Sequence, residues 1–406
     1  MFITQKSSML KRLMYKLKWH FTLAMCSMMP SLACAAEPAE KFSLNLPAGF
    51  KANIYAKLDS MPRMMAFDLE GNLFVTSAKS NNLMMLTDKN LDGVAEAPRL
   101  IAKDLNTPHG LAFLDGTLLI ANQSGVVKLT KENGSWSTPS PFISNLPSGG
   151  HTLKTIKIGP DNHLYLNVGS SCNVCNESDP TRATILRYTK EGKPAGALAV
   201  VGRHTTLPPI WASGLRNSQG FAWHPVTHKM FATNNGADMR SDRKNGQVND
   251  DLPPEHINQI TPGAHYGWPH CWGSHTSPGD IITDPNFSGA EGFCETTTAP
   301  AITLASHSTP IGMTFLSKSR FPIEFKGDAI VALHGSWNRD QLSGYKLVRI
   351  QFKHGKPNRV VDFATGWLKN NKAWGRPVDV IVGPDGTLYV SDDRMGYIVR
   401  IVYSID

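Results

Sequence analysis

The segment GGHTLKTIKIGPDNHLYLNVG, residues 149–169, contains two short runs in which apolar and polar residues alternate. This alternation predicts β-strands over 151–158 and 163–168. The intervening Gly159-Pro160-Asp161-Asn162 has the composition of a tight turn and carries no catalytic role in this interpretation. His151 follows two glycines, which let the backbone approach another group closely. The segment therefore predicts a β-hairpin with a functional histidine at its upstream end, although a surface loop histidine would have the same local sequence.

The same two-strand unit recurs along the chain. Equivalent apolar positions of its second strand are separated by 45, 46, 66, 100 and 58 residues; they are Leu73, Leu118, Leu164, Met230, Ile330 and Leu388. A basal period in the mid-forties is typical of four-stranded propeller blades, and the longer gaps accommodate insertions. Long segments of helical period are almost absent. The sequence therefore predicts an all-β protein, a single six-bladed β-propeller over residues 36–406.

The last repeat offers only three strands, and a fourth is available near the other end of the chain. Residues 50–58, FKANIYAKL, have the apolar pattern of an outer strand. We predict that this N-terminal strand completes the last blade. Such an exchange closes the ring and removes an exposed sheet edge.

Residues 1–35 have the pattern of a secretory signal peptide, with five Lys or Arg residues, an apolar run and Ala33-Cys34-Ala35. Without this segment the formal net charge falls from +8 to +3, and no long basic run remains that would favour nucleic acid. The apolar run is shorter than the roughly 18 residues of a membrane span. We therefore expect a periplasmic or secreted protein without stable membrane insertion.

Four cysteines follow the signal segment: Cys172, Cys175, Cys271 and Cys294. An even number in an exported chain favours disulfides over metal. Proximity in sequence predicts the pairs Cys172–Cys175 and Cys271–Cys294. Asn176, rather than a histidine, follows the C-x-x-C, which argues against c-type haem attachment. A redox-active pair or a zinc site is the alternative.

In a propeller, the segments that lead into the inner strands lie on the same face as the loops between the second and third strands. The first group carries Arg63, His109, His151, Arg216, Asn217, Thr309 and Arg376, and the second carries Gln123, 234–238, 334–339 and 392–394. Three arginines and two histidines around one axis predict a pocket for an anionic ligand. Two alternatives are that Arg216 pairs with Asp238, and that Trp268 and Trp337 serve packing.

Four motifs taken together resemble the glucose/sorbosone dehydrogenase family over roughly residues 43–403. They are His151 with Gly159-Pro160-Asp161, GLRNSQG at 214–220, YGWP at 266–269, and RPVD at 376–379 with its following Gly-Pro-Asp-Gly. The stretches DDLPPE at 250–255 and HGSWNR at 334–339 resemble the sorbosone-dehydrogenase-like branch. The resemblance implies a six-bladed quinoprotein that uses pyrroloquinoline quinone (PQQ) and calcium.

The resemblance also implies roles for individual residues. His151 would be the base that takes a proton from a sugar hydroxyl while hydride passes to PQQ. Arg216 and Asn217 would lie beside the cofactor, and the backbone carbonyls of Gly236 and Ala237 would hold calcium. Further contacts to PQQ are expected from Arg63, Lys154, Trp337, Arg339, Arg376 and Asp379, and the three carboxylates of PQQ explain why the mouth is basic. Two departures are Val378, in place of a second basic residue, and a family lysine that only Arg339 or Lys154 could replace.

The implied activity is oxidation of a sugar or a related polyol or aldose. The chain has no haem motif, so a separate periplasmic acceptor would take the electrons. Two other functions stay open. A calcium-dependent lactonase can use a six-bladed propeller with acidic and amide ligands in the channel, and a binding propeller needs no chemistry. Asp250, Asp251 and Glu255 would either bind a second, structural calcium or form an ordinary solvated loop.

Overall fold

The computed structural model describes residues 42–404 apart from 198–199, 202–203 and 206–207. The expected signal peptide at 1–35 lies outside the described residues. From Phe42 onward the chain forms a single compact unit. None of the segments described forms a helix that is long and apolar enough to cross a membrane.

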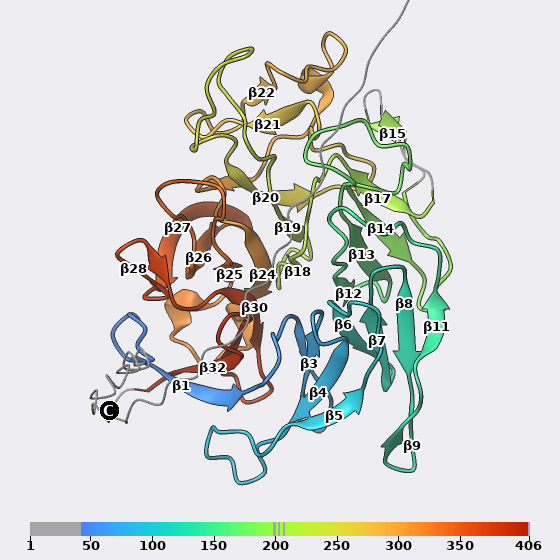
Figure 1. Ribbon diagram of the computed structural model, residues 1–406, viewed down its shortest axis with the longest axis vertical. Coiled ribbons are helices and arrows are strands. Elements are labelled where there is room, and N and C mark those ends of the chain that lie inside the picture. Colours follow the sequence, from blue (N-terminus) through green and yellow to red (C-terminus); the bar gives the residue numbers. More distant parts are fainter. Residues whose placement is uncertain (1–41, 198–199, 202–203, 206–207, 405–406) are drawn as a thin grey trace, which may run out of the picture. The chain divides into compact units, whose positions relative to one another are not determined.

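Six four-stranded antiparallel sheets form a six-bladed β-propeller, which confirms the predicted fold (Figure 1). Blade one consists of β2 (Met65–Phe67), β3 (Leu73–Ser77), β4 (Asn82–Leu86) and β5 (Arg99–Ala102). Blade two consists of β6 (Leu111–Leu114), β7 (Thr117–Ala121), β8 (Val126–Leu129) and β11 (Ser140–Ile143). Blade three consists of β12 (Ile156–Ile158), β13 (Leu164–Val168), β14 (Thr184–Tyr188) and β17 (Ile210–Ser213). Blade four consists of β18 (Phe221–Trp223), β19 (Met230–Asn234), β20 (Glu255–Ile260) and β23 (Ile302–Leu304). Blade five consists of β24 (Pro310–Phe315), β25 (Ala329–Leu333), β26 (Lys346–Lys353) and β27 (Lys356–Ala364). Blade six consists of β30 (Pro377–Val382), β31 (Leu388–Asp392), β32 (Tyr397–Tyr403) and β1 (Phe50–Lys57).

Smaller elements decorate the loops. The two-stranded hairpins are β9 (Lys131–Glu132) with β10 (Ser135–Trp136), β15 (Val200–Val201) with β16 (His204–Thr205), β21 (Cys271–Gly273) with β22 (Ile281–Thr283), and β28 (Leu368–Lys369) with β29 (Lys372–Ala373). The helical turns in the described residues are short 3-10 helices, η1 (Cys294–Thr296), η2 (Leu316–Lys318) and η3 (Ile323–Phe325).

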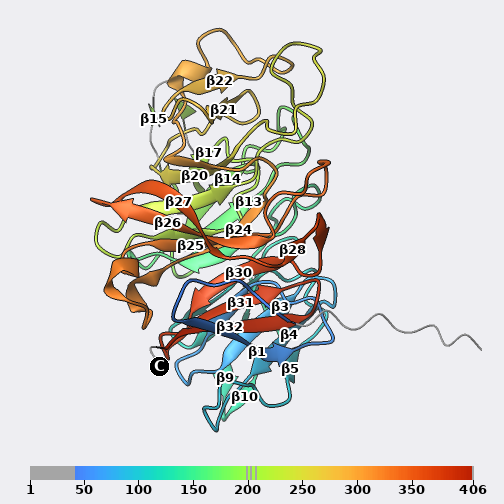
Figure 2. The same ribbon diagram turned by 90° about the vertical axis from the view of Figure 1, so that its left-hand side faces the viewer.

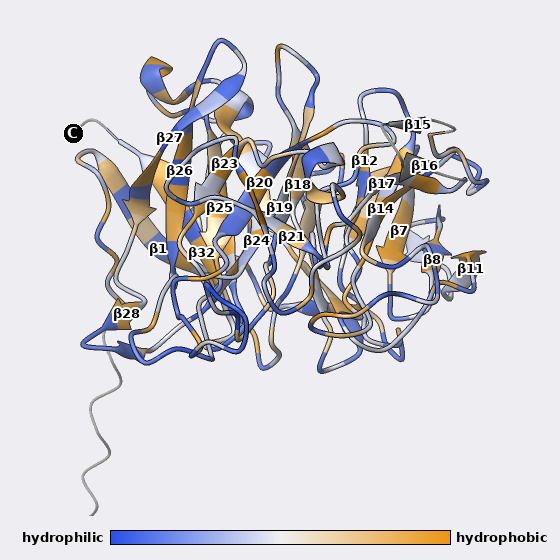
Figure 3. Cartoon of the chain, turned by 90° about the horizontal axis from the view of Figure 1, so that it is seen from above, coloured by the Kyte–Doolittle hydropathy of each residue, from blue (hydrophilic) through white to orange (hydrophobic). Residues whose placement is uncertain are grey.

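The core is distributed between neighbouring blades. Every residue of β3, β13, β19, β25 and β31 is buried, because each second strand is covered on both faces by the adjacent sheets. Between blades two and three, for example, Leu119 and Val126 pack with Ile156 and Leu164. In Figure 3 many blade strands are largely hydrophobic, whereas hydrophilic residues are frequent in the loops. The polar loops are therefore free to form a site at one end of the ring.

The N-terminal strand completes the last blade, as predicted. β1 pairs antiparallel with β32, from Phe50 opposite Tyr403 to Lys57 opposite Tyr397 (Figure 2). The Phe50 ring packs edge-to-face against Phe321, Phe325, Phe363 and Tyr403, with centroids 4.7–5.2 Å away. This exchange joins residues from the two ends of the described chain into one sheet, so that the ring is closed by a strand and an aromatic cluster.

One predicted strand is shorter than expected. The inner strand of blade three, β12, begins at Ile156 rather than at His151. The backbone of residues 151–154 does not pair with β13 as a strand would. The His151 amide donates to the Ser170 carbonyl at 2.9 Å, and the Lys154 carbonyl accepts from the Gly110 amide at 2.8 Å. His151 consequently lies in a loop that runs across the mouth of the channel instead of in a strand.

Candidate active site

A cavity of about 230 Å³ is lined by the segments that lead into the inner strands and by loops that follow the second strands. Predicted residues in its wall are His151, Arg216, Asn217, Gly236, Thr309, Trp337 and Arg376. Four other titratable side chains share the wall with them: Asp238 and His334, from the predicted ranges 234–238 and 334–339, and Glu255 and His307. The predicted face is therefore correct, but the cavity contains carboxylates as well as cations.

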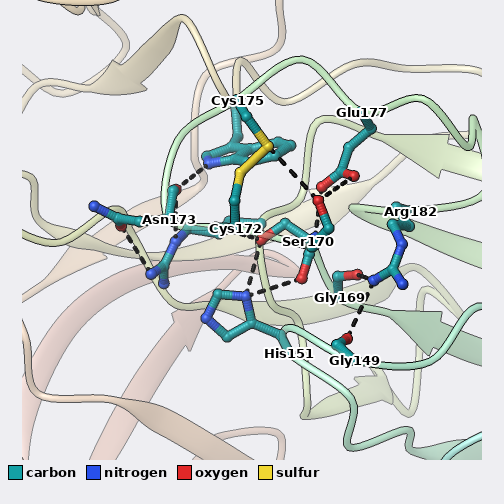
Figure 4. Close-up of a disulfide and its surroundings, with 12 residues drawn as sticks. Gly149, His151, Gly169, Ser170, Cys172, Asn173, Cys175, Glu177 and Arg182 are labelled. Atoms are coloured by element: carbon teal, nitrogen blue, oxygen red, sulfur yellow. Dashed lines mark hydrogen bonds between the residues drawn. A yellow bond between two sulfur atoms is a disulfide. The ribbon is translucent and has the colours of Figure 1, made fainter.

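The hydrogen bonds of His151 fix its tautomer (Figure 4). Its Nδ1 lies 3.2 Å from the carbonyl oxygen of Ser170 and 2.9 Å from the Ser170 hydroxyl. Because a carbonyl can only accept, Nδ1 carries the proton. The hydroxyl of Ser170 donates in turn to the Cys172 carbonyl at 2.6 Å. Nε2, which makes no hydrogen bond within the described residues, presents its lone pair as a base.

The electrostatic surroundings keep this imidazole neutral. Burial, with the positive charge of Arg216 next in importance, lowers the pKa of His151 to about 4. The base is therefore unprotonated at neutral pH. It is ready to accept a proton from a group placed at Nε2.

Glycines bring the His151 loop against the loop that follows β13. A Cβ on Gly150, whose φ is +59°, would lie 2.5 Å from the Ser170 carbonyl oxygen. A Cβ on Gly169 would lie 2.5 Å from the Cβ of His151. The predicted close approach is thus real for Gly150, but its partner is protein backbone instead of ligand.

Arg216 is buried, with 4% of its surface exposed, and pairs with Asp238. One terminal nitrogen donates to the Asp238 carboxylate at 2.7 Å and to the Asn173 side-chain oxygen at 2.9 Å. Its Nε donates to the Asn173 carbonyl at 3.1 Å. The ion pair that the sequence left open is therefore present. The other terminal nitrogen, Nη1, makes no hydrogen bond to the part of the chain described here.

A second arginine and an aromatic residue line the cavity beside Arg216. Arg376 donates to the carbonyls of His334 and Gly335 at 3.3 and 3.1 Å, which fixes its guanidinium in the wall. Trp337 is 68% exposed and lines the cavity, so it does not serve packing. Trp268 is buried and donates its indole N–H to the Asn173 carbonyl at 3.1 Å, as expected for a packing residue.

Glu255 is the main site residue that the sequence did not identify. It begins β20, is 3% exposed and accepts the Gly236 amide at 2.6 Å and the Thr309 amide at 3.3 Å. Burial raises its pKa to about 7. Asp250 and Asp251 instead bond the Arg339–Asp340 segment. The three acids therefore do not share one metal site, and Glu255 is not part of a solvated loop.

Two predicted cofactor contacts lie outside the cavity wall. Arg63 donates to the Asp393 carboxylate at 2.6 Å, and the same carboxylate contacts His334 Nε2 at 3.0 Å. Asp379 is fully buried and accepts the backbone amides of Met65 and Val380, both at 2.9 Å. In this structure, therefore, each of these two side chains is bound by the chain's own groups and does not line the cavity.

Arg339 and Lys154 also have structural partners. Arg339 donates to the carbonyls of Asp250 and Ser306 and pairs with Asp251, which joins two loops away from the cavity. The Lys154 ammonium donates to the carbonyls of Gln123, Pro147 and Thr152 at 2.6–3.2 Å. Neither lines the cavity in this structure.

We expect Lys154→Met to destabilise the protein without weakening ligand binding at the cavity. The substitution keeps the length of the side chain but leaves three carbonyls without their donor. The loss should be about 2–4 kcal/mol in the free energy of unfolding. Urea unfolding measures this loss. Normal stability combined with weakened binding would return Lys154 to the site.

The other histidine predicted at the mouth, His109, and the four cysteines are also located by the structure. His109 is fully buried, both of its ring nitrogens lack partners among the described residues, and burial lowers its pKa well below the ordinary value. It does not line the cavity. Disulfides join Cys172 to Cys175 and Cys271 to Cys294, which confirms both predicted pairs.

Comparison with known sequences identifies relatives along most of the chain. A family model described as TrAA12-like matches residues 44–404. An uncharacterized protein of Borreliella burgdorferi is 29% identical over an alignment of 394 positions, which covers 92% of this chain and 94% of that protein. A pyrroloquinoline quinone-dependent pyranose dehydrogenase of Coprinopsis cinerea is 25% identical over 421 residues. That match covers 91% of this chain but 56% of the fungal enzyme.

Solved structures share the fold. The holo form of the pyranose dehydrogenase PQQ domain from Coprinopsis cinerea superposes with a TM-score of 0.75 at 22% identity, covering 90% of this chain and 98% of that one. The calcium structure of a family AA12 carbohydrate-active enzyme from Trichoderma reesei superposes with a TM-score of 0.74, also at 22% identity, covering 89% and 97%. At these identities the likeness establishes the six-bladed propeller alone.

Proposed function

The chain belongs to the TrAA12-like family, and on this premise we propose that it is a quinoprotein dehydrogenase. The observation that carries the proposal is His151. Its tautomer leaves Nε2 as a base in a cavity that two arginines also line. The curated fungal relative is a PQQ-dependent pyranose dehydrogenase, and this chain spans about half of its length. The substrate we propose is accordingly a sugar or a related polyol or aldose.

His151 accepts the proton of the substrate hydroxyl at Nε2 while the carbon that bears this hydroxyl is oxidised. The Nδ1–H bond to Ser170 holds the ring in orientation and stabilises the imidazolium that results. PQQ, when bound, supplies the quinone that accepts the hydride. The exposed Trp337 at the cavity offers an apolar face on which a sugar ring can stack.

The residues present fit an anionic cofactor with a calcium ion. Arg216 and Arg376 are cations in the cavity wall, and Asn217 adds an amide. The side-chain oxygens of Asn235 and Asn338 are buried without a hydrogen-bond partner among the described residues. Together with the Asp238 and Glu255 carboxylates and the Gly236 carbonyl, they form the oxygen-rich set that calcium prefers. Ala237, which follows Gly236 in the same loop, is buried beside the cavity wall rather than in it, and its carbonyl is the second proposed ligand.

We also propose that the protein is exported to the periplasm and passes its electrons to a separate acceptor. Two disulfides favour an oxidising compartment. The signal-like pattern at 1–35 supports the same location.

Cofactor binding tests the proposal directly. PQQ with calcium should stabilise the folded protein by about 3 kcal/mol at a hundredfold excess over Kd. Thermal unfolding with PQQ, with calcium, with both and with neither measures this. Dye reduction over a panel of sugars and polyols then identifies the substrate class. No thermal shift at saturating PQQ and calcium would remove the basis of the quinoprotein assignment.

A calcium-dependent hydrolase is the second candidate, because Asp238, Glu255 and Asn235 place acidic and amide oxygens in the cavity. The sequence alone indicated mainly the basic residues that lead into the inner strands. The same experiment separates the two functions. A hydrolase would be stabilised by calcium alone and would open lactones without PQQ.

A further inference from the structure

The loop between β13 and β14, residues 169–183, contacts the cavity residues from behind (Figure 4). We call it the disulfide loop, because Cys172 and Cys175 are bonded within it. Its Ser170 orients His151 through the hydrogen bonds already described. Its Arg182 donates to the carbonyls of Ser148 and Gly149, in the turn that precedes His151. The loop therefore borders the cavity without supplying a wall residue.

Asn173, enclosed by the two cysteines, binds both members of the Arg216–Asp238 pair. Its side-chain oxygen accepts from Arg216 at 2.9 Å and from the Asp238 backbone amide at 2.8 Å. Its side-chain amide donates to the Asp238 carbonyl at 2.9 Å, and its own carbonyl accepts from Arg216 Nε at 3.1 Å. Asn173 thus ties the Arg216 guanidinium to the backbone of Asp238, while the Asp238 carboxylate also accepts from the Asn338 side-chain amide at 2.8 Å.

The disulfide holds Asn173 in this place. The bond between Cys172 and Cys175 closes a small ring of backbone around residues 173 and 174. Outside the ring, Glu177 accepts the amide and hydroxyl of Ser171 at 2.6 and 2.7 Å, and Trp268 donates to the Asn173 carbonyl. A side chain with two acceptor bonds and one donor bond on a cross-linked backbone is well preorganised.

We propose that Asn173 is a positioning residue, which acts through Arg216 and Asp238 and is kept in place by the Cys172–Cys175 disulfide. The inference rests on the proposed function, since its consequence is measured as affinity for PQQ. Asn173 does not line the cavity, so it contributes no ligand contact of its own. Its effect should therefore disappear when Arg216 is absent.

A double-mutant cycle tests this dependence. Asn173→Ala should raise the Kd for PQQ about tenfold at fixed calcium, measured by calorimetric titration of the folded protein. In an Arg216→Ala background the same change should alter Kd by less than about twofold. Asn173→Gln keeps both an amide acceptor and an amide donor, one methylene further from the backbone, so its Kd should lie between those of the wild type and Asn173→Ala. It also gives a second variant if Asn173→Ala folds poorly.

The control is Asn53→Ala in β1, which removes an amide hydrogen bond of 2.8 Å to the Gly93 carbonyl away from the cavity. It should leave Kd unchanged. The double variant Cys172→Ser/Cys175→Ser should raise Kd in the same direction as Asn173→Ala. If the wild type binds PQQ while Asn173→Ala behaves like Asn53→Ala, or if the two losses simply add, the positioning role is wrong. If the wild type does not bind PQQ, the proposed function itself fails.

Discussion

His151→Ala should lower kcat by about 10² to 10⁴ while leaving the Kd for PQQ close to that of the wild type. The substitution removes Nε2, the atom placed to accept the substrate proton, but it removes no cation from the cavity wall. His151→Gln is the sharper variant, because an amide can still bond Ser170 yet cannot act as a base near neutral pH. Steady-state turnover of the reconstituted enzyme and PQQ titration measure the two effects separately.

A matched control and a rival exist within the chain. His163 lies in the turn before β13 of the same blade, where its Nδ1 contacts the Asp161 carbonyl at 3.0 Å. His163→Ala should therefore leave both kcat and the Kd for PQQ unchanged. His109, the other histidine of the predicted mouth, is the rival base, but it is buried and does not line the cavity. Near-normal turnover of His151→Ala, or a collapse confined to His109→Ala, would contradict the assignment of the base.

The pH dependence follows from the same geometry. Burial and the neighbouring Arg216 favour the neutral imidazole, so the folded-state pKa of about 4 lies below the ordinary 6.5. A base acts in its neutral form, and its contribution is lost only as the pH falls through that pKa. In the cofactor-free protein, NMR titration should therefore place the His151 transition well below 6.5. A transition at or above 6.5 would mean that the ring is solvated.

The fold was largely predictable because strand period and turn composition are local properties. The six second strands lie at the apolar positions that the repeat identified, and even the exchange of β1 into the last blade followed from counting strands. The third and fourth strands of blades three and four were not identified. There the disulfide loop and the segment 235–254 separate strands that are adjacent in the sheet, and such insertions hide the period.

From the sequence, only the face of the propeller that carries the site could be predicted. Position in the chain indicated which residues approach the mouth, but it could not indicate how deep each side chain lies or what binds it. Arg63 and Lys154 were expected to contact a ligand, yet each is bound by protein oxygens and does not line the cavity. Glu255 and Asn173 were not expected at the site. From the sequence, Glu255 was expected in a structural calcium site or a solvated loop, and only a disulfide was indicated around Asn173.

Arg216→Ala should weaken PQQ binding by about 10- to 100-fold, the value of one charge-assisted hydrogen bond. Two nitrogens of Arg216, Nε and Nη2, already donate to Asn173 and Asp238, so Nη1 is the nitrogen left to bind a ligand carboxylate. The substitution also leaves the Asp238 charge unopposed beside an anionic ligand, which adds to the loss. Arg216→Lys keeps the charge but cannot bond Asn173 and Asp238 together, so its Kd should lie between those of the wild type and Arg216→Ala.

The same substitution must be separated from a purely structural ion pair. Arg187 donates to Asp161 at 2.7 Å, the distance of the Arg216–Asp238 pair, but it lies on β14 outside the cavity wall. Arg187→Ala should therefore lower the free energy of unfolding without changing the Kd for PQQ, whereas Arg216→Ala should change both. Urea unfolding and calorimetric titration of the two variants give the comparison. If both variants lose stability and neither loses affinity, Arg216 serves only to neutralise Asp238, and the cationic contact must come from Arg376.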